Sequence, residues 1–497
     1  MDVFQELYPN QNRFKYPKAG EKNATVSIYI YDLISRTSIK ADLETESEFY
    51  IPRIKWTKDE NVLSLQRMNR HQNKLDLIFV NANDGSSKTI FTETDEAYLD
   101  VSDNLTFLKN GKHFIWTSEK SGYNHIYLYN LKGKQLRKIT KGGYDVTDFY
   151  GVDESTNTVY FASAERSPLH RDVYSVQLNG KNKRTLNPKS GTNSATFSTN
   201  YKYFINRHSS ANTPYYFSLF NTKGDEIRTL KDNAQLKKSL SDYSLSQKEF
   251  FNFKTSDGVK LNGWIMKPYN FDANKEYPLF MYGGPGSQKV TDAWGGSNYM
   301  WFQMLTQLDY IVACVDNRGT GARGAKFKKS TYLQLGKLET QDQIEASKYL
   351  SKLPYINKER IGIFGWSYGG YMSSLCLLKG SESFKMAIAV APVTNWRYYD
   401  SIYTERYMRT PQENASGYDD NSPINHVEKL KGNYLLIHGS ADDNVHYQNT
   451  MEMSNALINA NKQFDLFIYP NRNHGIYGGN TRLHLFTKMT NYIKEKL

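Results

Sequence analysis

The sequence predicts a chain of two parts, an all-β first part organised as a propeller and an α/β second part with a mostly parallel sheet. Short apolar strands recur at a nearly constant interval up to about residue 220, and strands alternate with helical patterns after about residue 250. The chain has 497 residues and 39% hydrophobic content, which is enough for two cores. We expect residues 1–248 to form a partial β-propeller domain and residues 249–497 to form the α/β domain.

The first part contains two strand series in phase. One series begins at residues 28, 77, 126, 173 and 217, and a second, at residues 62, 114, 159 and 203, precedes the later four by about 12 to 15 residues. A shared period of about 45 to 50 residues without helical pattern indicates propeller blades. The strand at residue 28 lacks a preceding partner, so we expect about four to five blades. A β-sandwich is the alternative, although its strands need not recur at a fixed period.

The second part begins near residues 249–258, where the blade repeat ends. Beyond it, apolar strands are expected at residues 278–282, 309–315, 360–364, 386–390, 433–439 and 464–470, with helices over 338–353 and 370–378. This alternation favours a parallel sheet covered by helices.

A serine framed by glycines follows the strand at residues 360–364, in the sequence Gly365-Trp366-Ser367-Tyr368-Gly369. A strand, a sharp turn at the serine and a helix make up the nucleophile elbow of α/β-hydrolases. Residues without Cβ fit beside such a crowded turn. The pentapeptide also occurs by chance, so its catalytic interpretation depends on the partners of Ser367.

A serine hydroxyl needs a histidine base oriented by a carboxylate. Asp442 follows the strand at residues 433–439, and His474 follows the strand at residues 464–470, so both are expected at the carboxyl edge of the sheet. Asp443 is an alternative acid. Two other histidines are set aside, His438 as a packed core residue and His446 as a hydrogen-bonding loop residue.

Three blocks resemble the dipeptidyl peptidase IV branch of the prolyl oligopeptidase serine peptidases, namely residues 365–371, 441–446 and 474–476. The resemblance assigns the acid to Asp442. A fourth block, residues 281–288, is similar to the segment whose tyrosine completes the oxyanion hole, which implies that Tyr282 and the amide of Tyr368 bind the oxyanion. Without the flanking block, Tyr282 would be interpreted as an ordinary strand-end tyrosine in a chain with 38 tyrosines.

An aromatic segment, residues 391–407, suits a pocket for the flat, apolar ring of proline. From composition alone, such a segment is more often core. The resemblance implies that Asn444 donates to a substrate carbonyl and that the pocket walls are Tyr368, Val393, Trp396, Tyr399, Tyr403 and Val445.

The number of blades departs from the family, whose propeller has eight. We therefore expect the chain to be an amino-terminally truncated version of the family pattern. Family members hold the substrate ammonium with a pair of glutamates, and no such pair occurs in the blades of this sequence. Glu44, Glu46 and Glu48 are expected in a solvated loop.

The resemblance implies a serine peptidase that acts on peptides and releases amino-terminal dipeptides with proline or alanine in the penultimate position, without metal or cofactor. A prolyl tripeptidyl peptidase, a broad esterase and an inactive interaction module remain alternatives. The family also implies a possible homodimer and an extracytoplasmic location.

Composition excludes other classes. The net charge is +12, but lysines are spread along the chain, and the clusters at residues 181–184 and 326–329 are expected in solvated loops, so nucleic acid is not an expected partner. The sequence contains no run of eighteen apolar residues, which a membrane-spanning helix would need, and residues 1–7 lack the features of a signal peptide. Cys314 and Cys376 are expected to be buried and unpaired.

Overall fold

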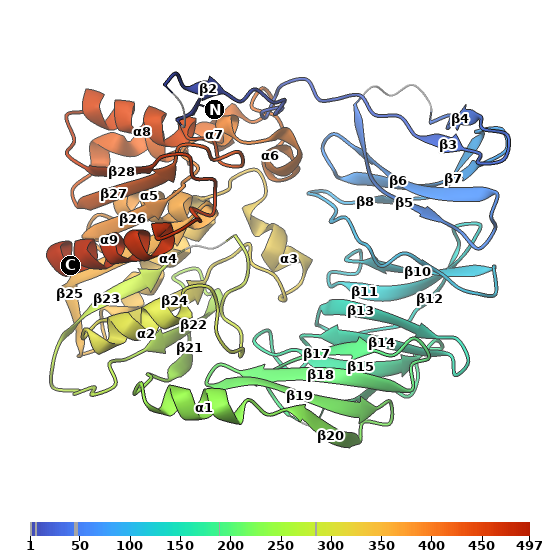
Figure 1. Cartoon of the computed structure of the whole chain (residues 1–497), viewed down its shortest axis with the longest axis horizontal. Coiled ribbons are helices and arrows are strands. Elements are labelled where there is room, and N and C mark those ends of the chain that lie inside the picture. The colour runs from blue at the N-terminus through green and yellow to red at the C-terminus, as the bar shows by residue number, and fades with distance from the viewer. Residues whose placement is uncertain (1, 5–6, 44–47, 188, 284–285) are drawn as a thin grey trace.

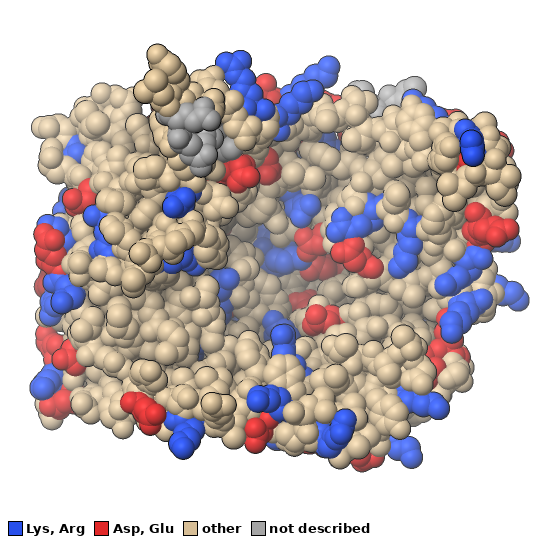
Figure 2. Space-filling view, viewed as in Figure 1, with Lys and Arg blue, Asp and Glu red and all other residues tan. Residues whose placement is uncertain are grey.

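The computed structural model describes residues 2–4, 7–43, 48–187, 189–283 and 286–497. A series of small antiparallel sheets lies beside an α/β part with one large sheet, and a hollow separates them on one face (Figures 1 and 2). Acidic and basic side chains surround this hollow (Figure 2).

Four of the small sheets have four antiparallel strands each, in chain order. They are β5 (Phe49–Trp56), β6 (Val62–Asn69), β7 (Lys74–Asn81) and β8 (Ser87–Thr94); β9 (Thr106–Phe107), β10 (His113–Ser118), β11 (His125–Asn130) and β12 (Gln135–Lys138); β13 (Val146–Asp153), β14 (Thr158–Ser163), β15 (Asp172–Gln177) and β16 (Arg184–Thr185); and β17 (Thr192–Phe197), β18 (Tyr203–Ser210), β19 (Thr213–Asn221) and β20 (Glu226–Lys231). Two shorter pairs precede them, β1 (Asp2–Val3) with β2 (Asn10–Gln11), and β3 (Tyr29–Tyr31) with β4 (Ser38–Lys40). Both predicted strand series fall on these strands, so the partial propeller is confirmed.

The large sheet has eight strands in the order β21-β22-β24-β23-β25-β26-β27-β28. Their bounds are β21 (Lys248–Lys254), β22 (Lys260–Met266), β23 (Tyr277–Tyr282), β24 (Ile311–Asp316), β25 (Ile356–Trp366), β26 (Met386–Val390), β27 (Asn433–Gly439) and β28 (Asp465–Tyr469). From β24 to β28 every pairing is parallel, which confirms the mostly parallel sheet. The boundary between residues 248 and 249 stays a prediction.

Helices cover both faces of this sheet (Figure 1). Met281 and Ile363 face one core, which Leu375 of α5 joins, whereas Phe280 and Phe364 face the other core with α2 and α9. The α-helices are α1 (Ala234–Ser241), α2 (Tyr299–Gln307), α3 (Ala325–Lys328), α4 (Lys337–Leu350), α5 (Tyr368–Lys379), α6 (Ser401–Met408), α7 (Ala415–Asp419), α8 (Gln448–Asn459) and α9 (Thr481–Lys496).

Residues 14–23, which we call the amino-terminal strap, run along the α/β part instead of joining a blade. Ala19 N donates to Tyr399 O at 3.1 Å, and Ser401 N donates to Pro17 O at 2.9 Å. The strap therefore lies beside the aromatic segment that precedes and includes α6.

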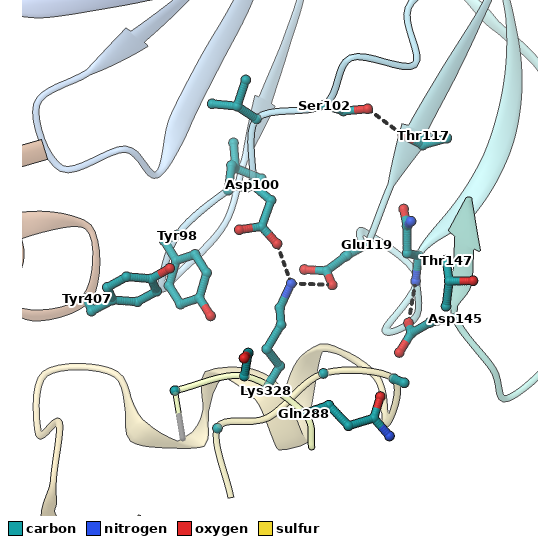
Figure 3. Close-up of a pocket in the computed structure, with 18 of the residues that line it drawn as sticks. Tyr98, Asp100, Ser102, Thr117, Glu119, Asp145, Thr147, Gln288, Lys328 and Tyr407 are labelled. Atoms are coloured by element: carbon teal, nitrogen blue, oxygen red, sulfur yellow. Dashed lines mark hydrogen bonds and ion pairs between the residues drawn. The ribbon is translucent and has the colours of Figure 1, made fainter. Parts of the chain in front are cut away.

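The prediction of a solvated loop at residues 326–329 is wrong. Lys328 ion-pairs with Asp100 and Glu119 (Figure 3). Lys329, whose side chain is 9% exposed, pairs with Asp95 at 2.7 Å. These carboxylates belong to the propeller, so the lysines cross the boundary between the two parts. Their charges are neutralised by residues distant in the chain, which the local sequence does not reveal.

Glu48 lies in an exposed bend, as predicted, and its carboxylate contacts Arg70 at 3.0 Å, while Glu44 and Glu46 lie outside the described residues. Cys314 and Cys376 are buried and free, as predicted. Among the helices that the structure describes, none is both long and apolar enough to cross a bilayer.

The blade cores generate a stability prediction. Phe114 on β10 is 0% exposed and packs between Phe91, Phe107 and Tyr129, so Phe114→Ala should lower the free energy of unfolding by about 3–5 kcal/mol. Leu136 on β12 of the same sheet is 43% exposed, and Leu136→Ala should change it by only about 0.5 kcal/mol. Urea unfolding would measure both, and equal losses would contradict this account of the core.

Candidate active site

Ser367 lies on the turn between β25 and α5, in a strained conformation with φ 59° and ψ −118°. Its amide donates to Val390 O on β26 at 2.8 Å, which fixes the turn against the sheet. A Cβ at Gly365 would lie 2.1 Å from Gly369 O, and one at Gly370 would lie 2.9 Å from Val390 O. The glycines are therefore required by close backbone approach, and the surrounding contacts hold the strained serine at the edge of the sheet.

Asp442 and His474 meet at the same edge. The buried Asp442 carboxylate accepts a hydrogen bond from His474 Nδ1 at 2.7 Å through Oδ2. Its Oδ1 accepts the backbone amides of Asn444 and Val445 at 3.0 and 2.9 Å. Of the two acids considered, Asp442 is thus the one that His474 contacts.

The loop that carries His474 is tied to the elbow. Trp366, which precedes Ser367, donates its indole N–H to His474 O at 3.0 Å. Among the hydrogen bonds of the described residues, none joins the Ser367 hydroxyl to the His474 ring. Such catalytic hydrogen bonds are often long without substrate and tighten in the substrate complex.

His438 is a functional neighbour that the sequence analysis missed. It is fully buried, as expected, but its Nε2 lies 2.8 Å from Val445 O and 3.2 Å from Asp442 Oδ2. Since a carbonyl oxygen only accepts, Nε2 carries the proton, and Nδ1 accepts the Thr450 hydroxyl at 2.7 Å. Two histidines therefore donate to one oxygen of Asp442.

These donors decide the ionisation of Asp442. Burial alone would raise the pKa of this carboxyl, but the hydrogen bonds from His438 and His474 outweigh burial and lower the pKa to about 2. Asp442 is ionised throughout the physiological range and can stabilise a protonated His474.

Tyr282 ends β23, beside Phe364 on β25, and Gly283 N donates to Phe364 O at 2.9 Å. Its ring packs on Phe302 and Phe364, with centroid distances of 5.4 and 5.9 Å. Burial raises the pKa of Tyr282 to about 12, so the hydroxyl keeps its proton as a donor. Gly284 and Pro285, from the same predicted block, lie outside the described residues.

Tyr368 is the first residue of α5, where a backbone N–H has no partner within the helix. This position follows Ser367 directly, as in the oxyanion holes of nucleophile elbows. The structure thus leaves a backbone donor beside the candidate nucleophile.

The aromatic segment forms a box of rings. Trp396 lies 5.5 Å from Tyr368, 5.8 Å from Tyr399 and 5.8 Å from Tyr403 between ring centroids, and Val393 and Val445 are buried. The Tyr399 hydroxyl donates to Asn444 Oδ1 at 2.8 Å, so the amide nitrogen of Asn444 remains as a donor.

The sequence analysis also missed Glu339, at the start of α4. This buried carboxylate accepts the Tyr368 hydroxyl at 2.7 Å and the Gly336 amide at 3.0 Å. Burial raises the pKa of Glu339 to about 7 against these two hydrogen bonds. Glu339, Tyr368 and Tyr403 line a cavity of about 600 Å³ that also contacts the propeller residues drawn in Figure 3.

His446 was expected to hydrogen-bond in its loop, but its ring packs on Tyr16 of the amino-terminal strap at 4.1 Å between centroids, and its Nε2 is buried without a hydrogen-bond partner. Tyr16 also donates its hydroxyl to Asn444 O at 2.8 Å. The strap therefore contacts the loop that supplies Asn444 and Val445.

The low pKa of Asp442 predicts a stability effect. Because the folded pKa of about 2 lies below the ordinary aspartate value of 3.8, ionised Asp442 contributes stability above pH 4, which is lost as the pH falls towards 2. The difference in free energy of unfolding between wild type and Asp442→Asn should narrow by about 2 kcal/mol over this interval. Urea unfolding at several pH values would test it, and a constant difference would contradict it.

Comparison with known proteins places these features in a family. Residues 297–497 match the Prolyl oligopeptidase family, and residues 2–215 match the family described as Dipeptidyl peptidase IV (DPP IV) N-terminal region. The crystal structure of Porphyromonas gingivalis dipeptidyl peptidase 4 has a TM-score of 0.96 and 46% identity, covering 100% of this chain and 71% of that chain.

Two curated relatives are similar at the level of sequence. Dipeptidyl peptidase 4 of Trichophyton equinum is 34% identical over 489 residues, which cover 94% of this chain and 63% of the relative. Dipeptidyl peptidase 4 of Arthroderma otae is 33% identical over 509 residues, which cover 98% of this chain and 65% of the relative. The chain spans less than two thirds of either relative. It belongs to the prolyl oligopeptidase family of serine peptidases, in the dipeptidyl peptidase IV branch.

Proposed function

We propose that this chain acts as a serine peptidase that releases dipeptides with proline or alanine in the penultimate position from peptide amino termini. The observation that carries the proposal is the Asp442–His474 hydrogen bond beside the strained Ser367 turn, next to a box of aromatic rings. The names of the similar proteins, dipeptidyl peptidase 4, support release of dipeptides.

In the proposed reaction, the Ser367 hydroxyl attacks the carbonyl carbon of the scissile bond while His474 Nε2 takes its proton. Asp442 stabilises the resulting imidazolium through Nδ1. Collapse of the tetrahedral intermediate breaks the C–N bond, His474 gives its proton to the leaving amine, and an acyl-enzyme remains. Water, activated by His474, then releases the dipeptide and regenerates Ser367. No step needs a metal or cofactor.

The oxyanion would be held by the Tyr282 hydroxyl and the Tyr368 amide, from two neighbouring strand ends. Proline would enter the box of rings, where shape and apolar contact select it without a hydrogen bond to the ring. Asn444 would donate to the carbonyl of the preceding residue.

A prolyl tripeptidyl peptidase would use the same groups and differ in where the substrate ammonium is held. A broad esterase would not need the ammonium, and an inactive interaction module would leave Ser367 unreactive. We also infer, from the family resemblance, that the enzyme works outside the cytoplasm and forms a homodimer.

A comparison of two chromogenic anilides tests the reaction. The chain should hydrolyse glycyl-prolyl p-nitroanilide but not its amino-blocked analogue, because the proposed substrate has a free amino terminus. Ser367→Ala should lower kcat by a factor on the order of 10⁶. Equal turnover of both anilides would show that a free amino terminus is not required and would contradict dipeptidyl release, and preference for a tripeptidyl anilide would indicate tripeptide release.

The role of Tyr282 has its own test. Tyr282→Phe removes one donor to the oxyanion and should lower kcat by about 10² to 10³-fold with little change in KM. Tyr310→Phe is a matched control, because this buried hydroxyl lies just before β24 and donates to Ile493 O of α9 at 3.4 Å. Equal kcat values for the Tyr282 variant and wild type would remove Tyr282 from the oxyanion hole.

A further inference from the structure

The aromatic pocket depends on the short helix α6 and the residues just before it. Tyr399 precedes this helix, and Tyr403 lies on it, with its ring stacked at 24° to the ring of Trp396. The helix has eight residues and ends at Met408, and the next residue, Arg409, has a positive φ of 56°. A helix of this length is marginal without contacts from its surroundings, so what holds α6 decides where Tyr403 lies.

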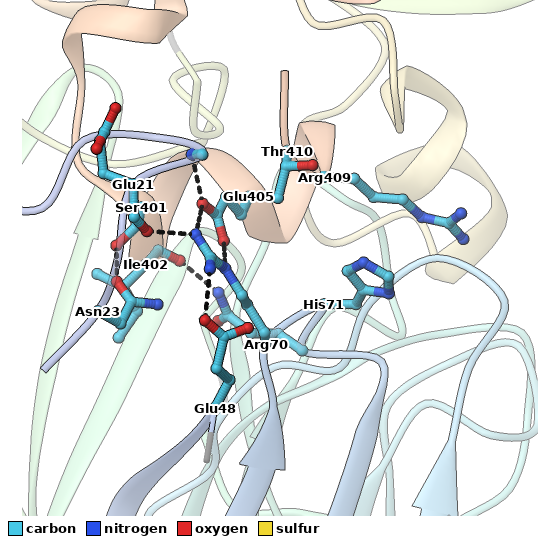
Figure 4. Close-up of polar contacts among 12 residues, drawn as sticks. Glu21, Asn23, Glu48, Arg70, His71, Ser401, Ile402, Glu405, Arg409 and Thr410 are labelled. Carbon is cyan, nitrogen blue, oxygen red and sulfur yellow. Dashed lines mark hydrogen bonds and ion pairs between the residues drawn. The ribbon is translucent and has the colours of Figure 1, made fainter. Parts of the chain in front are cut away.

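A turn of the propeller grips this helix. Arg70, at the turn between β6 and β7, forms a bidentate ion pair with Glu405 of α6, with Nε–Oε2 and Nη2–Oε1 distances of 2.7 Å (Figure 4). Two residues further, Gln72 donates to Ile402 O at 2.6 Å and accepts from Arg406 Nε at 2.8 Å. Side chains of the propeller thus contact both the side chains and the backbone of α6.

The charge of Glu405 makes this contact obligatory. The Glu405 side chain is 0% exposed, while that of Arg70 is 16% exposed. Glu405 Oε1 also accepts the amide of Gly20 at 2.8 Å, but among the described residues Arg70 supplies the positive charge that pairs with it. A buried carboxylate that loses its cation is strongly unfavourable, and a short helix would move to hydrate it.

Arg70 is itself held in place from three sides. Its Nη1 contacts Glu48 at 3.0 Å, and its Nη2 donates to Glu21 O of the amino-terminal strap at 2.6 Å (Figure 4). The guanidinium therefore joins a blade, the strap and α6 at one point. Such fixed bidentate geometry is specific to arginine, because lysine offers a point charge only.

We propose that Arg70 is a positioning residue for the aromatic pocket, which through Glu405 holds α6 so that Tyr403 and Tyr399 form the wall for proline. The inference rests on the proposed function for its substrate, but the role of Arg70 in ordering α6 does not. The propeller then contributes to the specificity of the α/β part.

The experiment compares Arg70→Gln, Arg70→Lys and Glu405→Gln in the whole chain. Arg67→Gln is the matched control, because Arg67 on β6 pairs with Asp76 of the same blade at 3.0 Å and donates to Leu43 O, not to α6. Hydrogen exchange of peptides covering residues 401–408 reports the order of α6 without reference to activity.

Arg70→Gln should raise exchange in residues 401–408 at least tenfold and leave α9 unchanged. It should raise KM for glycyl-prolyl p-nitroanilide by about ten- to 10²-fold with a smaller fall in kcat, as expected for a displaced binding wall. Labelling of Ser367 by a small fluorophosphonate should stay within twofold, since that reagent does not need the proline pocket. Arg70→Lys should raise KM less than Arg70→Gln does. Arg67→Gln should show the KM of wild type and the same exchange in residues 401–408.

Unchanged exchange in α6 and unchanged KM in Arg70→Gln would overturn the proposal, as would equal effects of Arg67→Gln. If Arg70→Gln does not fold, Glu405→Gln tests the proposal in its place, because it removes the buried charge with little change in side-chain size. The double variant leaves no buried carboxylate without a cation, so it should be at least as stable as Arg70→Gln alone. If wild type hydrolyses neither anilide, the proposed function fails, whereas the exchange of α6 still tests Arg70.

Discussion

The candidate site depends on the parallel pairing of the large sheet. In the register of this sheet, Tyr282 lies beside Phe364, and Val390 lies beside both Trp366 and Ile437. The carboxyl ends of these strands therefore meet at one edge, and Ser367, Asp442 and His474 follow them within a few residues. Residues far apart in sequence need only short loops to reach one another, and those loops are fixed by backbone hydrogen bonds such as Ser367 N to Val390 O.

Three buried carboxylates fix side chains around this edge, each with different donors. Asp442 accepts two histidines and two amides, Glu339 accepts the Tyr368 hydroxyl, and Glu405 pairs with Arg70. Burial makes each unmet carboxylate costly, so each one restricts the position of what it binds. His474, Tyr368 and the helix α6 are therefore each held in place by a buried carboxylate.

The local parts of the site could be predicted from sequence. The elbow, Asp442 and His474 stand at strand ends, and strand, turn and glycine patterns are properties of neighbouring residues. Arg70, Glu339 and Lys328 could not, because each has a partner distant in the chain, and a charged residue in a local window is indistinguishable from a solvated one. For this reason the sequence predicts a solvated loop around Lys328, which the structure contradicts. His438 was correctly expected to be buried, but an apolar strand gives no sign that its ring reaches Asp442.

The boundary between the two parts is therefore more than a covering of the active site. The helix α3 has four residues and α6 has eight, and both are too short to be stable alone. Each carries a charge met by the propeller, the partly buried Lys328 by Asp100 and Glu119, and the buried Glu405 by Arg70. The cavity between the parts is lined by Lys328 from one helix and Tyr403 from the other. The ion pairs that join the propeller to the α/β part thus also shape the wall of the cavity between them.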